Sequence, residues 1–192
     1  MAGIAGILLA AGAGRRMGRP KALVADPSHD GLTLVERGLQ VLHDARCTPV
    51  MVVVGAAAAE VRARAGAADR VVEAHDWATG QSASLVAALN AAASTDAYAA
   101  CVLLVDLPDV GPDALRRVIR AAGRRTNALA RAAYGGVPGH PVVIGRDHWE
   151  AVIASANGDA GARDYLAAHR HGVVECGDLA SGRDVDTPAD LA

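Results

Sequence analysis

The stretch LLAAGAGRRMGRPKAL, residues 8–23, joins an apolar run to a turn that is rich in glycine and positive charge. The apolar run, residues 4–10, predicts a buried strand. The turn after it contains Gly12, Gly14, Gly18, Arg15, Arg16, Arg19 and Lys21. A flexible backbone with free N–H groups and nearby cations suits an anion, above all a phosphate chain, although a plain surface turn with solvated arginines has the same composition.

The spacing of the glycines narrows the kind of phosphate loop. Gly12, Gly14 and Gly18 are spaced G-x-G-x-x-x-G, whereas the dinucleotide fingerprint requires G-x-G-x-x-G. The sequence also lacks a Walker loop, in which four residues separate the first glycine from Gly-Lys-Ser/Thr. The stretch therefore indicates a nucleotide-binding loop of neither a P-loop ATPase nor a dehydrogenase.

The composition predicts one domain, residues 1–192, with an aliphatic core. Hydrophobic residues make up 52% of the chain, but aromatic residues only 3%, so Ala, Val, Leu and Ile must fill the core. A formal net charge of -2 and the scarcity of aromatic rings argue against a nucleic-acid partner. Cys47, Cys101 and Cys176 form no C-x-x-C pair and are expected to be buried thiols of a reducing cytosol.

The sequence favours a cytoplasmic protein without a membrane segment. The apolar start, residues 1–14, resembles the core of a secretory signal. Such a signal carries its positive charge before the apolar run, whereas Arg15 and Arg16 follow it. No continuous apolar run approaches the ~20 residues that a membrane span requires.

Predicted strands and helices alternate along the first two-thirds of the chain. We expect strands over residues 4–10, 50–55, 70–74 and 100–106, and helices over residues 32–46, 56–66, 80–93 and 111–122. The alternation predicts right-handed βαβ crossovers and a mostly parallel sheet with helices on both faces. From Asn127 on, the pattern predicts an antiparallel excursion of two strands joined by a Gly-Pro turn, then two short helices and a strand. The expected fold class is α/β, a single-domain, three-layer, Rossmann-like fold.

Acidic residues fall where such a sheet binds ligands, beyond the carboxyl ends of its strands. Asp106 ends the most apolar strand, where its Asp-x-Pro context also fits a turn or a helix cap. Asp184 and Asp186 share one face of an extended segment, and the TPAD segment after them fits a capped helix start. Because Mg²⁺ prefers carboxylates together with substrate phosphates, Asp106 and Asp186 are candidate metal ligands.

Two further segments carry polar residues that are candidates for substrate contacts. Gln81, Ser82 and Ser84 lie in an alanine-rich stretch, where they either hydrogen-bond a base or ribose or cap a helix. His140 lies between glycine and proline, where it either contacts a substrate or stabilises a turn.

The opening stretch resembles the N-terminal signature of the MobA-like nucleotidyltransferases. It matches their L-A-A-G-x-x-x-R-M-G-x-x-K pattern at Leu9, Ala10, Ala11, Gly12, Arg16, Met17, Gly18 and Lys21. Further blocks follow in the same order as in that family: DWATGQSASL, DLP, GHPVVI, GDAGARDYL and DVDTPADL. Together the six blocks span nearly the whole chain, and they most resemble the molybdenum cofactor cytidylyltransferases. The chain stops soon after the last block, so the terminal helix is expected to be short.

This resemblance implies transfer of CMP from CTP to the terminal phosphate of molybdopterin, with Mg²⁺ as cofactor and pyrophosphate as the second product. The catalytic roles that it implies are Arg16 on the outgoing pyrophosphate, Lys21 at the α-phosphate, and Asp106 with Asp186 on the metal. It places Leu9, Ala10, Ala11, Gly12, Gly14, Gln81, Ser82 and Ser84 at the nucleotide, and His140 with residues 158–163 at the acceptor. A molybdoenzyme or its chaperone is the partner that would receive the product.

Two alternatives stay open. The first is the same fold acting on another phosphorylated acceptor or with GTP, because the acceptor pocket, residues 134–166, cannot be decoded from the sequence. The second is a nucleotide-binding regulator without activity. Loss of Lys21, Asp106 or Asp186 would favour the regulator, and all three are present.

Overall fold

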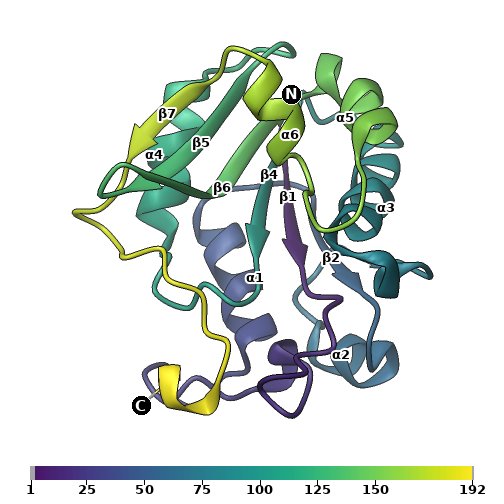
Figure 1. The fold of residues 1–192 in the computed structure, drawn as a ribbon, viewed down its shortest axis with the longest axis vertical. Coiled ribbons are helices and arrows are strands. Elements are labelled where there is room, and N and C mark those ends of the chain that lie inside the picture. Colours follow the sequence, from purple (N-terminus) through teal and green to yellow (C-terminus); the bar gives the residue numbers. More distant parts are fainter. Residues whose placement is uncertain (1–2, 192) are drawn as a thin grey trace.

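A seven-stranded mixed sheet runs through the computed structural model, which describes residues 3–191 (Figure 1). Its strands are β1 (Ile4–Leu9), β2 (Val50–Val54), β3 (Arg70–Glu73), β4 (Ala99–Leu104), β5 (Leu129–Tyr134), β6 (Val137–Gly145) and β7 (Gly172–Glu175). They are ordered β3-β2-β1-β4-β6-β5-β7, and β6 runs antiparallel to both of its neighbours, whereas the other pairs are parallel. The predicted α/β class with an antiparallel excursion is confirmed.

Helices cover both faces of this sheet and create a core on each. One face is covered by α1 (Leu34–Asp44), α2 (Ala58–Arg64) and α4 (Pro112–Ala122), and the other by α3 (Gln81–Ala93), α5 (Trp149–Ser155) and α6 (Arg163–Ala168). Leu39, Val61 and Leu115 anchor the first core, and Leu89 and Trp149 anchor the second. Strands β1, β2 and β4 are almost wholly buried, as two-sided burial in a parallel sheet requires, whereas the edge strand β3 is partly exposed.

Strand β4 is shorter than the sequence predicts. It ends at Leu104, opposite Leu9 at the end of β1, and Asp106 lies in the turn beyond it. In the sequence, the apolar run of β4 continues to Val105, but β1 ends at Leu9, which pairs with Leu104. The pattern of apolar residues alone therefore places the end of β4 too late.

The predicted Gly-Pro turn between β5 and β6 is wrong. Gly135 and Gly136 form the turn instead, both with positive φ, and Pro138 and Pro141 lie within β6. In the β5–β6 register, Arg131 pairs with Val142 but Ala133 pairs with Pro138, so β6 carries a bulge between these pairs. Prolines are tolerated there because a bulge and a hairpin end do not need every N–H of the strand.

The C-terminal segment returns to the end of the molecule where β1 and β4 stop (Figure 1). The N–H of Val185 donates to the carbonyl oxygen of Asp106 over 2.9 Å and fixes the segment beside the turn after β4. The three cysteines are buried free thiols, as predicted. Within residues 3–191, no helix is both long and apolar enough to cross a bilayer.

Candidate active site

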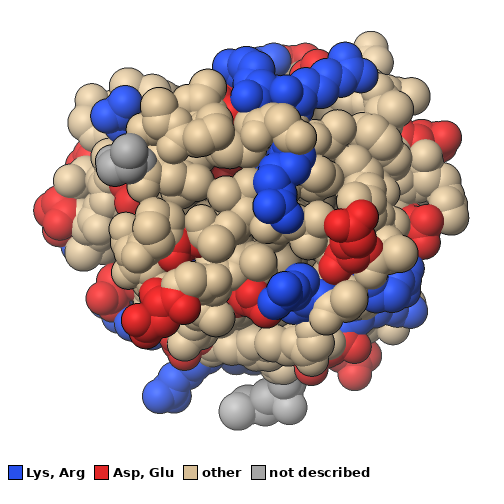
Figure 2. Space-filling model, turned by 90° about the horizontal axis from the view of Figure 1, so that it is seen from below, with Lys and Arg blue, Asp and Glu red and all other residues tan. Residues whose placement is uncertain are grey.

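A cleft of about 470 Å³ opens beyond the carboxyl ends of β1 and β4. Its walls are the glycine-rich loop of residues 11–16, the 3-10 turn Trp77–Thr79, the start of α3, and the two acids Asp106 and Asp186. Figure 2 views the molecule from this end and shows blue and red side chains interspersed, without one broad surface of a single sign. A ligand in the cleft would therefore be attracted by the few cations of its lining, Arg15, Arg16 and Lys21, and not by a broad positive surface.

The glycine-rich loop takes its shape from one tight contact. Gly14 has a φ of +59°, and a Cβ at this position would overlap the carbonyl oxygen of Arg19. The space beside Gly12 is open, since a Cβ there would meet no atom within 4 Å. The loop thus folds back on itself at Gly14 and leaves room at Gly12 for a ligand to approach the backbone.

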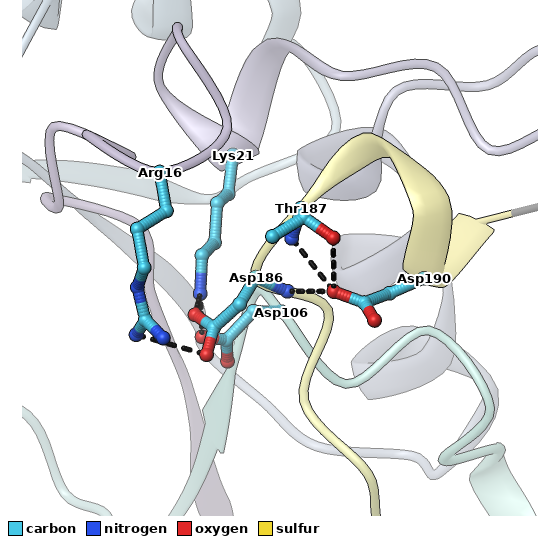
Figure 3. Close-up of polar contacts among 6 residues, drawn as sticks. All are labelled: Arg16, Lys21, Asp106, Asp186, Thr187 and Asp190. Atoms are coloured by element: carbon cyan, nitrogen blue, oxygen red, sulfur yellow. Dashed lines mark hydrogen bonds and ion pairs between the residues drawn. The ribbon is translucent and has the colours of Figure 1, made fainter.

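Lys21 lies between two carboxylates at one side of the cleft (Figure 3). Its Nζ donates to Asp106 Oδ2 over 2.8 Å and to Asp186 Oδ1 over 2.6 Å. Burial alone would lower the pKa of Lys21, but the bonds to the two carboxylates outweigh it and raise the pKa above its ordinary value. Lys21 is the only lysine in the sequence, and its compact ammonium fits between two carboxylates in a way that a planar guanidinium would not.

Arg16 approaches the same cluster from the glycine-rich loop. Its Nη2 lies 2.9 Å from Asp186 Oδ2, while 74% of its side chain is exposed. Lys21, and more weakly Arg16, hold the pKa of the Asp186 carboxyl below its usual range. An exposed side chain of this kind can leave Asp186 at little cost, because surface ion pairs are worth about 0–1 kcal/mol.

Asp106 has an unused oxygen that a cation would satisfy. Its Oδ1 is buried and finds no hydrogen-bond partner within the described chain. One oxygen each from Asp106, Asp184 and Asp186 lie within 4.8 Å of one another. A buried carboxylate oxygen without a partner is costly, and an all-oxygen donor set suits Mg²⁺ or Mn²⁺. The residues present therefore fit a divalent metal.

The predicted helix start after Asp186 is also found, as the 3-10 turn Pro188–Leu191. Asp190 Oδ2 accepts hydrogen bonds from the N–H groups of Asp186 and Thr187 and from the Thr187 hydroxyl (Figure 3). Asp190 thus caps the turn and fixes the backbone of Asp186.

The cleft brings together most of the predicted nucleotide-binding residues. Its lining includes Leu9, Ala11, Gly12, Gly14, Gln81 and Ser84. Ala10 is buried in the core instead. Ser82 does not line the cleft, because its buried Oγ accepts a hydrogen bond of 3.1 Å from the N–H of Gly161 and so tethers that loop to the start of α3.

His140 lies outside the cleft, in a smaller cavity of about 50 Å³ that shares Leu9 and Gln81 with it. His140 lies in the bulge of β6, so it does not stabilise a turn between strands. It also does not line the cleft that contains Lys21. Burial, and after it the positive charge of Arg131, lower the pKa of His140 to about 4. His140 is therefore neutral at physiological pH.

Three further residues line these two sites. The sequence analysis singled out neither Trp77 nor Arg131, and it placed Asp159 at the acceptor only as part of residues 158–163. Trp77 forms one wall of the cleft and packs so closely on Gly55 that a Cβ there would lie 2.5 Å from its ring. Asp159 lines the same cleft and accepts the N–H of Gln81 over 3.2 Å. Arg131 lines the smaller cavity, and a lone charge inside the apolar strand LARAAY was the signal that could have found it.

Solved structures share this architecture. The chain matches Rv0371c from Mycobacterium tuberculosis with a TM-score of 0.79 and 30% identity, covering 98% of this chain and 95% of that one. A structure of Rv0371c in complex with manganese matches as well, with a TM-score of 0.69. A nucleotidyl transferase from Methanothermobacter, at 23% identity and a TM-score of 0.81, has the same fold. The fold is that of the nucleotidyltransferases.

Comparison of sequences identifies the family of nucleotidyltransferases to which the chain belongs. The model of the MobA-like NTP transferase domain matches residues 6–173, and the chain belongs to this family. Enzymes of the family are nucleotidyltransferases that generally use divalent metals. A protein from Paenarthrobacter nicotinovorans named nicotine blue oxidoreductase is 38% identical, over 96% of this chain and 92% of its own length. A probable molybdenum cofactor guanylyltransferase from Opitutus terrae is 36% identical, over 70% of this chain and 63% of its own length.

Proposed function

We propose that the protein transfers CMP from CTP to the terminal phosphate of a molybdopterin-type acceptor and releases pyrophosphate. The observation that carries the proposal is Lys21 held between Asp106 and Asp186 at the side of the cleft, beside a glycine-rich loop with Arg16 at its edge. Such transfer needs no side-chain nucleophile, because the phosphate of the acceptor attacks the α-phosphate of the nucleotide. The protein contributes position and charge.

The chain's own cations serve two stages of this reaction. The N–H groups of the glycine-rich loop bind the β- and γ-phosphates, and Arg16 turns from Asp186 to the departing pyrophosphate. Lys21 shifts from the carboxylates to the α-phosphate, where negative charge grows as the new bond forms. A contact that strengthens in this way lowers the barrier more than it tightens ground-state binding.

Asp106 and Asp186 would hold the divalent metal, which we propose to be Mg²⁺. When bound, the metal neutralises phosphate charge and fixes the reacting oxygens. Asp106 Oδ1 is the oxygen that supports this assignment, because it has no other partner among the described residues. The manganese complex of Rv0371c supports a divalent metal in this fold.

The choice of CTP rests on Ala11 and on the likeness to the cytidylyl branch. Ala11 lines the cleft, and its methyl group narrows the pocket where the guanylyl branch has glycine. Gln81 and Ser84, from the first turn of α3, are candidates for contacts with the base and ribose. The guanylyltransferase from Opitutus terrae supports the alternative donor, GTP.

The experiment that tests the proposal measures pyrophosphate release from each of the four nucleoside triphosphates. Each is supplied with Mg²⁺, with and without molybdopterin. We expect release that requires both the metal and the acceptor and is fastest with CTP. Nucleotide binding without any release would favour the non-catalytic regulator, and activity only with a different phosphorylated acceptor would replace molybdopterin.

A second candidate follows from the relative named nicotine blue oxidoreductase, which matches nearly the full length of this chain. The same cleft would then hold the pyrophosphate of a reduced dinucleotide, and electrons would pass to a conjugated organic acceptor. The glycine spacing G-x-G-x-x-x-G counts against this candidate. Oxidation of NADH or NADPH by the purified protein, followed by absorbance with nicotine blue as the electron acceptor, distinguishes this candidate from nucleotidyl transfer.

A further inference from the structure

Arg131 carries a partly buried charge that the fold does not neutralise. It lies on β5 beside the bulge of β6, and its side chain lines the cavity that contains His140. Its Nε is buried and has no hydrogen-bond partner, and its Nη2 makes only a long bond of 3.5 Å to the carbonyl oxygen of Gly139. Among the described residues, no carboxylate lies within ion-pair distance of this guanidinium.

The neighbours of Arg131 add positive charge or none. Arg163 lines the same cavity, and burial, followed by the charge of Arg163, lowers the pKa of Arg131 from its ordinary value. His140 is neutral and supplies no counter-charge. Removing part of a cation from water without a counter-charge is unfavourable, and an anion that enters the cavity would supply the missing counter-charge.

The other walls of the cavity are apolar, including Leu85, Val142, Ile144 and Leu166. A volume of about 50 Å³ leaves room for a small group but not for a nucleoside. Because Leu9 and Gln81 line both this cavity and the cleft, a molecule whose reacting phosphate lies in the cleft can extend into the cavity.

We propose that this cavity binds a small oxyanion, a carboxylate or a phosphate, through the guanidinium group of Arg131. The proposal goes beyond the proposed function and does not depend on it. The planar guanidinium offers Nε–H and Nη–H to two oxygens at once. His140 closes the cavity without adding charge.

The test follows the Nε–H resonance of Arg131 by NMR, assigned by its loss in Arg131→Met. Sodium acetate and inorganic phosphate are titrated separately, each at constant ionic strength, with and without saturating CTP to fill the cleft. We expect a saturable shift that persists with CTP present. Saturation by acetate identifies a carboxylate site, and saturation by phosphate alone identifies a phosphate site.

Arg120→Met is the matched control, because it removes the same charge from an exposed position on α4. We expect it to leave anion binding unchanged. We expect Arg131→Met to be at least as stable as the wild type, since a partly buried charge without a counter-charge is removed. The absence of a saturable shift with either anion would overturn the proposal. So would a large loss of stability in Arg131→Met alone, because it would show that the fold already satisfies Arg131. Neither readout depends on nucleotidyl transfer, so failure here is distinct from failure of the proposed function.

Discussion

Asp106 has two separate roles, one for its side chain in the site and one for its backbone in the fold. Its carboxylate contributes to the cleft, whereas its carbonyl oxygen fixes the C-terminal segment through Val185. We expect Asp106→Ala to fold, because the backbone bond survives, and to lose on the order of 100-fold or more in metal-dependent turnover. Steady-state pyrophosphate release measures the turnover, and circular dichroism shows whether Asp106→Ala is folded. Asp113→Ala, an exposed acid on α4, is the control, and near-normal turnover in folded Asp106→Ala would place the metal elsewhere.

Lys21 and a metal compete for the same two carboxylates. We therefore expect Lys21→Ala to bind Mg²⁺ about 5-fold more tightly without nucleotide, because a partly exposed ion pair of this kind is worth about 1 kcal/mol. With nucleotide present, the same variant should lose far more in kcat than in nucleotide affinity.

Calorimetric titration measures the affinities of Lys21→Ala for Mg²⁺ and for CTP, and steady-state pyrophosphate release measures its kcat. Because Lys21 is the only lysine, its 13Cε resonance in the wild type also reports directly whether the metal displaces it. Unchanged metal affinity together with an unchanged kcat would reduce Lys21 to a structural ion pair.

His140 should make the free energy of unfolding depend on pH between the pKa of the histidine in the unfolded chain and its lower pKa in the native protein. The unfolded chain takes up a proton near pH 6.5, but native His140 does so only near pH 4. Its contribution is therefore complete above pH 6.5 and is lost as the pH falls toward 4, by up to about 3 kcal/mol. Denaturant unfolding at pH 7.5 and pH 5 should show a smaller loss for His140→Asn than for the wild type. The control is His75→Asn, an exposed histidine, and an identical loss in all three proteins would contradict the assignment.

At the level of elements, the start of α3 depends on Gly80. Its φ of +128° is one that other residues rarely adopt, and a Cβ would overlap the carbonyl of Gly158 in the loop that Ser82 also tethers. We expect Gly80→Ala to lower the free energy of unfolding by about 1–3 kcal/mol. Thermal unfolding measures this, with Gly66→Ala, which has open space, as the matched control. Equal stability of the two variants would mean that the loop moves freely.

The elements themselves were largely predictable, and the exceptions share a cause. Continuous apolar runs identify β1, β2 and β4 because both sides of these strands are buried. The β5–β6 turn was misplaced because Pro138 and Pro141 usually end strands, and only pairing with β5 reveals the bulge that accommodates them. Asp106, Asp186 and Lys21 could be found from motifs. The lone charge of Arg131 in an apolar strand was visible in the sequence, but its lack of a partner is visible only in three dimensions.

At the scale of the whole molecule, two neighbouring sites share one wall. The cleft beyond β1 and β4 and the cavity of His140 and Arg131 meet at Leu9 and Gln81. A nucleotide in the cleft and a small group in the cavity would lie side by side near the ends of the central strands, where ligands of open α/β sheets bind.

The preference for CTP over GTP as the nucleotide donor depends on the shape of the whole cleft, to which Ala11 contributes. We expect kcat/KM for CTP to exceed that for GTP by about 10-fold or more, since one misplaced group in a pocket is worth about 1–3 kcal/mol. Ala11→Gly should reduce this ratio by giving the larger base more room. Side-by-side kinetics with the same acceptor measure it, and a wild-type preference for GTP would replace the cytidylyl assignment with the guanylyl one.

The central claim is that the α-phosphate of a nucleotide moves to a phosphorylated acceptor. The most direct measurement incubates the protein with Mg²⁺, molybdopterin and CTP labelled with 32P at either the α- or the γ-phosphate, and then separates the products. The account predicts that the α-label enters a new dinucleotide and the γ-label enters pyrophosphate, both in equal amounts and neither in Asp106→Ala. Label in orthophosphate, or unreacted CTP beside oxidised NADH in the parallel assay, would contradict it.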